Sequence, residues 1–155
     1  MSMKIRRAKP EDAAEVCDLI CRSITELCHP DHGGDEAHLS NWLSNKTVDN
    51  VRSWILQSHF FVGEQAERIV GIVAMNDSGK ITLNYVDPAV RFHGVSKTLM
   101  LSMEENARTL GITECHLESS QTALRFYQAL GYVKSEQSCG IPLTGSSATV
   151  LSKQL

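Results

Sequence analysis

The clearest absence in this chain of 155 residues is a long apolar run. A helix that crosses a membrane needs about 20 consecutive, mostly apolar residues, and no stretch of the sequence approaches that length. The first seven residues, MSMKIRR, also lack the apolar segment of a secretory signal. From these absences we expect no membrane association and a cytoplasmic location.

The chain also has little net charge. Its 15 basic and 18 acidic residues give a formal charge of -3, whereas general nucleic-acid binders are usually basic. The composition, 42% hydrophobic and 21% charged, is typical of a globular protein. A chain of 155 residues can bury one sizeable core, so we expect a single domain over residues 1–155.

Cysteine is sparse, and its count is odd. The five cysteines are Cys17, Cys21, Cys28, Cys115 and Cys139. An odd count without a signal peptide argues against a disulfide framework. The first three share one predicted helical face, with His29 and His32 just beyond, so a metal site is conceivable. Ligand pairs in structural zinc sites are usually closer in sequence and come in two sets. We therefore expect buried cysteines and no metal.

The most informative segment that is present spans residues 81–100. An apolar strand at residues 81–86 is ended by Pro88, and a loop at residues 91–96 leads into a helix. The backbone N–H groups at such a helix start form an anion site that suits phosphate above all. Gly94 would let the backbone approach a ligand closely, and we expect Ser96 to be the N-cap.

Hydrophobic periodicity predicts alternating strands and helices along the chain. Strands are expected at residues 4–8, 60–64, 69–75, 81–86, 115–119, 132–137 and 149–153. Helices are expected at residues 10–27, 35–45, 48–55, 96–110 and 121–130. The 115–119 strand follows a strand–helix crossover, so it should lie parallel to the 81–86 strand. The predicted class is α/β, an α+β sandwich around one mixed, mostly antiparallel sheet of about seven strands flanked by about four helices.

Two motifs carry a family resemblance. Arg91-x-x-Gly94-x-Ser96 resembles the acetyl-coenzyme A loop of the GNAT superfamily of N-acetyltransferases, Gln/Arg-x-x-Gly-x-Gly/Ala, with serine as the one departure. A later GNAT motif is matched by Ser120-x-x-Ala123-x-x-Phe126-Tyr127, followed by Gly131-Tyr132. Each motif alone is weak, but both lie at strand–helix junctions and the element order over the whole chain agrees. The resemblance implies a GNAT-like fold.

The resemblance also implies where acetyl-coenzyme A would bind. Its pyrophosphate should lie on the backbone N–H groups between residues 92 and 98, and its pantetheine arm along the edge of residues 84–86, paired with backbone groups. The implied binding residues are Asn84, Tyr85, Val86, Arg91, Phe92, His93, Gly94, Val95, Ser96, Lys97, Thr98, Ser120 and Tyr127. Ser120 could instead only cap the helix that follows it.

The implied chemistry is direct attack of an amine on the thioester in a ternary complex. By family analogy the Val86 N–H stabilises the oxyanion, and Tyr127 is the general acid that protonates the departing thiolate. A phenol has an ordinary pKa near 10, so it is protonated and able to donate at neutral pH. The alternative for Tyr127 is a buried aromatic that packs in the core with Phe126.

The sequence leaves the general base open. Glu118 and His116 share one face of their strand by the two-residue alternation of strands, and either could serve. Glu26, His29 and His32 lie near the first helix break, which in similar folds borders the acceptor pocket. They could bind the substrate or supply the base, and a chain of water molecules is a further route.

The resemblance favours transfer of an acetyl group to a primary amine of a small molecule or a protein. The alternative is a non-catalytic acyl-coenzyme A sensor that kept the phosphate loop but lost the chemistry. A nucleotide-binding module of another fold is disfavoured, because the Gly-x-Gly-x-x-Gly and Gly-Lys-Ser/Thr patterns are absent. A homodimer is common among similar proteins and is expected here as one option.

Overall fold

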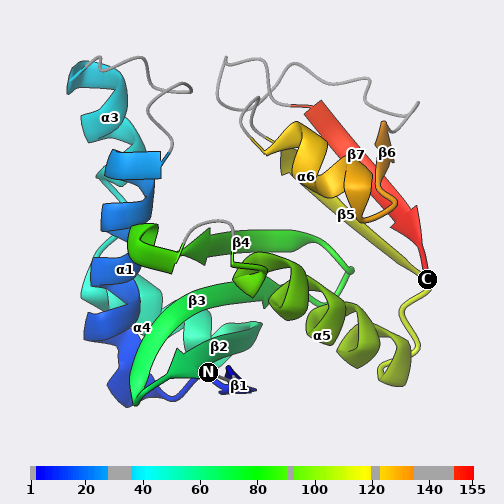
Figure 1. Cartoon of the computed structure of the whole chain (residues 1–155), viewed down its shortest axis with the longest axis horizontal. Helices are drawn as coiled ribbons and strands as arrows, with labels where there is room; N and C mark the ends of the chain where they lie inside the picture. The colour runs from blue at the N-terminus through cyan, green and yellow to red at the C-terminus, as the bar shows by residue number, and fades with distance from the viewer. Residues whose placement is uncertain (1–2, 28–35, 91–92, 120–122, 135–148) are drawn as a thin grey trace.

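The computed structural model describes residues 3–27, 36–90, 93–119, 123–134 and 149–155 (Figure 1). The strands in these ranges are β1 Lys4–Arg7, β2 His59–Gln65, β3 Arg68–Met75, β4 Ile81–Val86, β5 Glu114–Ser119, β6 Val133–Lys134 and β7 Thr149–Gln154. The α-helices are α1 Ala13–Leu27, α3 Glu36–Leu43, α4 Val48–Gln57, α5 Val95–Thr109 and α6 Leu124–Ala129, with short 3-10 helices η1 Pro10–Asp12 and η2 Pro88–Val90. None of the described helices is long and apolar enough to cross a membrane.

The predicted α/β class and mostly antiparallel pairing are confirmed, but the strands form two sheets instead of one. Strands β1-β2-β3-β4 make the first sheet and β5-β7-β6 the second, and every named pair is antiparallel. The expected parallel pairing of β4 with β5 is reduced, in the described ranges, to an isolated bridge between Lys80 and His116. From that bridge the two strands diverge (Figure 1).

A glycine makes this bridge possible. The His116 N–H donates to the Gly79 carbonyl oxygen at 3.1 Å. Gly79 has a positive φ of 91°, and a Cβ built on it would collide with the Glu114 carbonyl oxygen. Only glycine combines the left-handed turn with so close an approach of two backbones. The turn at residues 77–79 was predicted from sequence, but the contact it makes with β5 was not.

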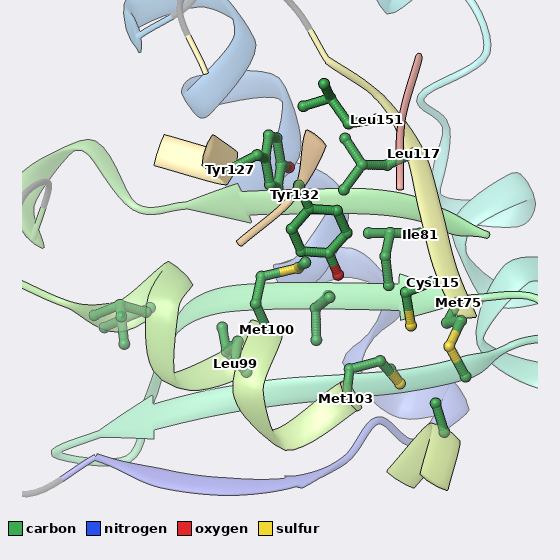
Figure 2. Close-up of a cluster of buried hydrophobic side chains, with 14 residues drawn as sticks. Met75, Ile81, Leu99, Met100, Met103, Cys115, Leu117, Tyr127, Tyr132 and Leu151 are labelled. Atoms are coloured by element: carbon green, nitrogen blue, oxygen red, sulfur yellow. The ribbon is translucent and has the colours of Figure 1, made fainter. Parts of the chain in front are cut away.

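Helices cover both faces of the first sheet because β3 is apolar on both sides. Val73 and Met75 belong to the core shared with α5 and the second sheet, which Figure 2 shows. The alternate residues Ile72 and Ala74 belong to a second core with α1 and α4. This two-sided burial is the pattern of a strand inside a sandwich, and it places β4, the next strand, at the outer edge of the first sheet.

A buried polar cluster joins α5 to the second sheet. The Tyr132 hydroxyl donates to Glu104 Oε2 at 2.9 Å, and Lys153 Nζ lies 2.8 Å from Glu104 Oε1. Glu104 is only 1% exposed, so both partners are needed to offset the cost of burying its charge. Burial and the Glu104 carboxylate raise the pKa of Tyr132 well above its ordinary value, so Tyr132 stays a neutral hydrogen-bond donor.

Cys115, in this same core, makes the stability of the fold depend on pH in the alkaline range. Burial, followed by the Glu104 carboxylate, raises the pKa of the thiol from 9.0 to about 11. A group whose pKa is higher in the folded than in the unfolded chain stabilises the fold. This stabilisation is fully present below the unfolded pKa and is lost as the pH rises to the folded pKa. The free energy of unfolding should therefore fall between pH 9 and 11, by about 3 kcal/mol from this thiol.

The check is denaturant unfolding of the wild type and Cys115→Ala at pH 8 and pH 10.5. We expect the wild type to lose about 2 kcal/mol more than the variant over this interval, because only the wild type must keep the thiol protonated. The other titrating groups are present in both proteins, so their contributions largely cancel in the comparison. The exception is Tyr132, because Cys115 contributes to raising its pKa. Equal losses would contradict the assignment of this pH dependence to Cys115.

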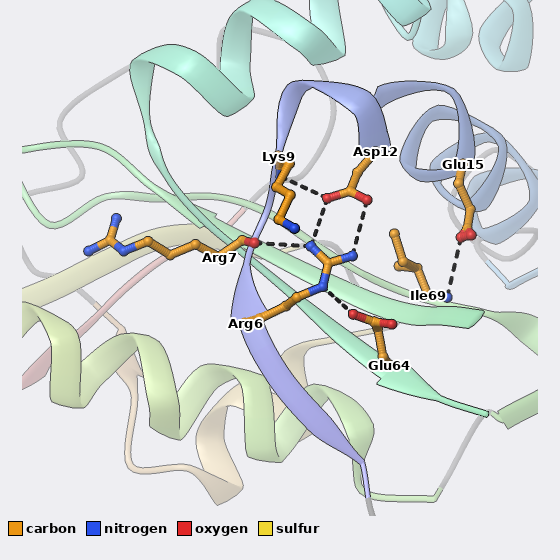
Figure 3. Close-up of polar contacts among 7 residues, drawn as sticks. All are labelled: Arg6, Arg7, Lys9, Asp12, Glu15, Glu64 and Ile69. Atoms are coloured by element: carbon orange, nitrogen blue, oxygen red, sulfur yellow. Dashed lines mark hydrogen bonds and ion pairs between the residues drawn. The ribbon is translucent and has the colours of Figure 1, made fainter. Parts of the chain in front are cut away.

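An ion-pair cluster fixes the N-terminal strand to the start of α1 (Figure 3). Arg6 contacts Asp12 through two nitrogens, at 2.8 and 3.1 Å, and also pairs with Glu64 on β2. The Arg6 hydrogen bond holds the pKa of the Asp12 carboxyl below its usual range. The Glu15 carboxylate accepts the Ile69 N–H at 3.4 Å. These contacts connect β1, η1 and α1 to β2 and β3 of the first sheet.

Candidate active site

The outer edge of β4 is the backbone surface on which the site is built. β4 is the end strand of the first sheet, and the Asp87 N–H donates inward to the Val70 carbonyl oxygen on β3 at 2.8 Å. Backbone N–H groups alternate sides along an antiparallel strand, so the Val86 N–H points outward, toward the second sheet. The same alternation turns the backbone groups of Asn84 outward.

The segment just after β4 is fixed by a buried carboxylate. Asp87 is 3% exposed, its Oδ1 accepts the Ala89 N–H at 2.9 Å, and the same oxygen lies 3.2 Å from Arg22 Nη1. Arg22 belongs to α1, so this ion pair ties α1 to η2 and hence to the chain that leads into α5. The contact was not foreseen from the sequence.

Helix α5 begins one residue after Gly94, which corrects the predicted cap. Gly94 is the N-cap with a left-handed φ of 79°, and Ser96 lies inside the first turn. The reason is conformational: the sharp turn into the helix needs a positive φ, which glycine adopts without strain. The Gly94 carbonyl oxygen accepts both the N–H and the hydroxyl of Thr98, at 3.1 and 2.9 Å.

The first turn of α5 presents backbone N–H groups that lack intrahelical partners, as every helix start does. Val95 is buried in the core, whereas His93, Lys97 and Thr98 are exposed and Ser96 is half-buried. Two cationic or titratable side chains, His93 and Lys97, therefore flank the turn, an arrangement that favours an anion. The predicted residues Arg91 and Phe92 lie outside the described residues.

Tyr127 reaches the β4 edge from helix α6. Its side chain is 7% exposed, and its hydroxyl oxygen accepts a hydrogen bond from Asn84 Nδ2 at 3.1 Å. Its ring packs edge-on against Phe126, with a centroid separation of 5.1 Å. It also packs edge-on against Tyr132 at 5.9 Å, and Figure 2 shows these two tyrosines. The ring thus packs in the core with Phe126, as the alternative interpretation expected, and the hydroxyl faces a polar group on β4. The role of Tyr127 as general acid stays a prediction.

The candidate bases lie on the other face of β5. His116 is half-buried and Glu118 is exposed, whereas the alternate residues Cys115 and Leu117 are buried, so the predicted alternation is confirmed. Glu118 Oε1 lies 3.8 Å from Lys80 Nζ, with both side chains about a third exposed. Glu26 is exposed near the end of α1. The predicted residues Ser120, His29 and His32 lie outside the described residues.

Comparison with protein families decides what this arrangement belongs to. A family model described as an acetyltransferase (GNAT) domain matches residues 28–141. The chain belongs to the GNAT acetyltransferase family. The enzyme class expected from the two motifs, an N-acetyltransferase, is confirmed by this match. Comparison with curated proteins gives no match.

Solved structures share the fold of this GNAT chain over its full length. A GCN5-related N-acetyltransferase from Rhodopseudomonas palustris has a TM-score of 0.87 at 22% identity, covering 100% of this chain and 99% of the other. The PaiA N-acetyltransferase from Thermoplasma acidophilum, in complex with coenzyme A, has a TM-score of 0.83 at 18% identity, covering 100% of both chains.

A third likeness is to part of a longer protein. N-acetylglutamate synthase from Neisseria gonorrhoeae, complexed with coenzyme A and N-acetyl-glutamate, has a TM-score of 0.67 at 17% identity. All of this chain aligns with 35% of that one. At these identities the three structures show that the fold is shared, and the predicted GNAT-like fold is confirmed.

No cluster of three or more metal-binding side chains is found where this GNAT chain is described. Cys17 and Cys21 are free thiols that donate to the Lys46 carbonyl oxygen, at 3.2 and 3.7 Å. Burial raises the pKa of Cys17 to about 11, so it is a protonated hydrogen-bond donor that holds the start of α4 against α1. Cys28, the third member of the proposed helical face, lies outside the described residues.

Proposed function

We propose that this GNAT enzyme transfers the acetyl group of acetyl-coenzyme A to a primary amine of a small molecule or a protein. One observation carries the proposal: an outward-facing strand edge, β4, leads directly to a helix N-terminus with a glycine cap, and a buried tyrosine hydroxyl meets that edge. A thioester cosubstrate with a diphosphate and two amides has the chemical groups that such a surface binds. The coenzyme A complexes of two structural neighbours support this assignment.

The N–H groups of α5 and the preceding loop would hold the pyrophosphate. The left-handed φ of 79° at Gly94 turns the chain so that the N–H groups of residues 95–97 converge in front of the helix, where the dipole favours negative charge. Among the described residues, a Cβ on Gly94 would meet no atom within 4 Å, which leaves room for a ligand on that side. His93 and Lys97 would add charge from the rim.

The acyl transfer itself would use few protein groups. The amine nitrogen attacks the thioester carbonyl carbon, forming the C–N bond, and the Val86 N–H at the β4 edge stabilises the oxygen that becomes negative. The C–S bond then breaks, and the electron pair stays on sulfur, which takes the proton of Tyr127. The tyrosinate regains a proton from solvent, and the amine nitrogen gives one up to a base.

The base and the acceptor site remain proposals at named positions. Glu118 Oε1 lies 3.8 Å from the Lys80 ammonium nitrogen. His116 lies two residues earlier on the same face of β5. Glu26, with His29 and His32, could bind a cationic amine, since carboxylates attract ammonium groups. We also propose that residues 1–155 form one domain, act without a metal and in the cytoplasm, and can pair as a homodimer.

The experiment is an acceptor screen with acetyl-coenzyme A, read as release of free thiol. We expect at least one primary amine in a panel of polyamines, amino acids and lysine peptides to raise thiol release above the rate without amine. If no amine is acetylated, calorimetric titration with acetyl-coenzyme A, run in parallel, shows whether the chain still binds the cosubstrate. Binding without turnover on any amine would favour the sensor alternative, and absence of binding would overturn the cosubstrate assignment.

A further inference from the structure

The carboxamide of Asn84, at the β4 edge, has a hydrogen-bond partner at its nitrogen but none at its oxygen among the described residues. Its Nδ2 donates to the Tyr127 hydroxyl oxygen at 3.1 Å. Its Oδ1 is buried and has no hydrogen-bond partner among the residues that the structure describes. A buried carbonyl oxygen without a donor is costly, and such atoms are rare in folded proteins. An unpaired acceptor of this kind is expected where the N–H group of a bound ligand supplies the missing hydrogen bond.

The position of Asn84 limits which ligand can supply that N–H. The residue lies on the outer strand of the first sheet, while Tyr127 belongs to α6, beside the second sheet, 43 residues along the chain. The contact therefore crosses from one sheet to the other beyond the Lys80–His116 bridge, where β4 and β5 diverge (Figure 1). A ligand that reaches Oδ1 must lie along this edge, next to the Tyr127 hydroxyl.

We propose that Asn84 Oδ1 accepts a hydrogen bond from the coenzyme A amide nearest the sulfur. This inference rests on the proposed function, because it assumes that Tyr127 faces the sulfur. In coenzyme A only two methylene groups separate the sulfur from that amide nitrogen. One carboxamide therefore serves both neighbours: Nδ2 holds the hydroxyl that protonates the sulfur, and Oδ1 holds the N–H a short distance along the same arm.

This assignment gives the side chain a role in register. Hydrogen bonds from the backbone of β4 repeat along the strand, so a ligand arm could pair with it in more than one position. A single side-chain acceptor at Asn84 selects one of these positions and stops the thioester at Tyr127. Because Nδ2 is the donor in the contact with Tyr127, the bond does not use the hydroxyl hydrogen that the reaction transfers.

The test compares coenzyme A with an analogue in which oxygen replaces that one amide nitrogen. The analogue keeps the length and the pyrophosphate but loses the N–H donor. By calorimetry we expect the wild type to bind coenzyme A about tenfold or more tightly than the ester analogue, the usual effect of one buried hydrogen bond. Equal affinities in the wild type would overturn the inference, and this comparison does not depend on any variant folding.

Variants assign the preference to the side chain. In Asn84→Ala the preference for the amide should fall to within about twofold of unity. In Asn84→Asp, which keeps an acceptor oxygen, the preference should persist, while turnover falls because the carboxylate accepts the Tyr127 hydroxyl hydrogen. Thr82→Ala, an exposed position on the same strand, should keep the wild-type preference. A preference that is unchanged in Asn84→Ala would assign the N–H to another acceptor.

The outcomes also separate this inference from the proposed function. If coenzyme A does not bind at all, the proposed function fails, and the inference fails with it. If coenzyme A binds and acetyl-coenzyme A is turned over, but the ester analogue binds equally well, only the role of Asn84 fails.

Discussion

Tyr127→Phe lowers kcat by about a hundredfold or more, while the affinity for acetyl-coenzyme A changes little. The expected loss follows from the geometry: the variant keeps the ring in its core position against Phe126 and Tyr132 and removes only the hydroxyl that would protonate the thiolate. Steady-state thiol release gives kcat, and calorimetry gives the affinity for the cosubstrate.

Tyr132→Phe is the matched control for this experiment. It removes a second hydroxyl from the same aromatic cluster, one that bonds Glu104 at 2.9 Å and not Asn84. We expect this variant to lose about 1–3 kcal/mol of unfolding free energy, because Glu104 loses a donor, with kcat close to that of the wild type. Wild-type turnover in Tyr127→Phe would reduce Tyr127 to a packing residue, whatever the control shows.

Gly94→Glu should abolish binding of coenzyme A. The added carboxylate would meet the diphosphate at the N-terminus of α5, because no other described residue lies within 4 Å of a Cβ at Gly94. Like charges at such short range oppose each other strongly in a partly desolvated site. Calorimetric titration measures the effect directly, without an acceptor amine.

Gly94→Gln separates charge from backbone strain. Both side chains are of nearly equal size, and both force a φ of 79° on a residue with a Cβ, at a cost of about 1–2 kcal/mol. We expect the affinity of Gly94→Gln for coenzyme A to be at most about tenfold lower than that of the wild type. Gly94→Glu should not bind coenzyme A measurably. If both variants bind with unchanged affinity, the diphosphate does not lie on this turn.

Periodicity and turn chemistry predicted most of the fold, because these signals are local. The apolar strand β3, the alternation of β5, the strand that ends before Pro88 and the helix that ends before Gly111 all follow from near neighbours in sequence, and the structure confirms them. The order of elements then limits the topology to a sandwich. What the order did not determine was that the strands form two sheets, since β5 was expected to pair parallel to β4 within one mixed sheet.

The site was predictable only as far as its motifs reach. The Gly94 turn and Tyr127 were found because short patterns mark them, but the N-cap was placed two residues late because serine is a stronger capping signal than glycine. Asn84 was expected to act through its backbone. Its side chain matters because Tyr127 reaches it from 43 residues away, and long-range contacts of this kind leave no mark in local sequence. A lone asparagine in an apolar strand was the one available signal.

The single backbone bridge at Gly79 has a consequence for how this enzyme could vary. The two sheets are joined at the backbone bridge between Lys80 and His116. The angle between β4 and β5 at that bridge determines how far apart the two strands lie at Asn84. A change at that turn would alter the distance between Asn84 on β4 and the Tyr127 hydroxyl without replacing either residue. Under the proposed function, acyl chains of different length could thus be accommodated by changes at residues 77–79, outside the residues proposed to bind acetyl-coenzyme A.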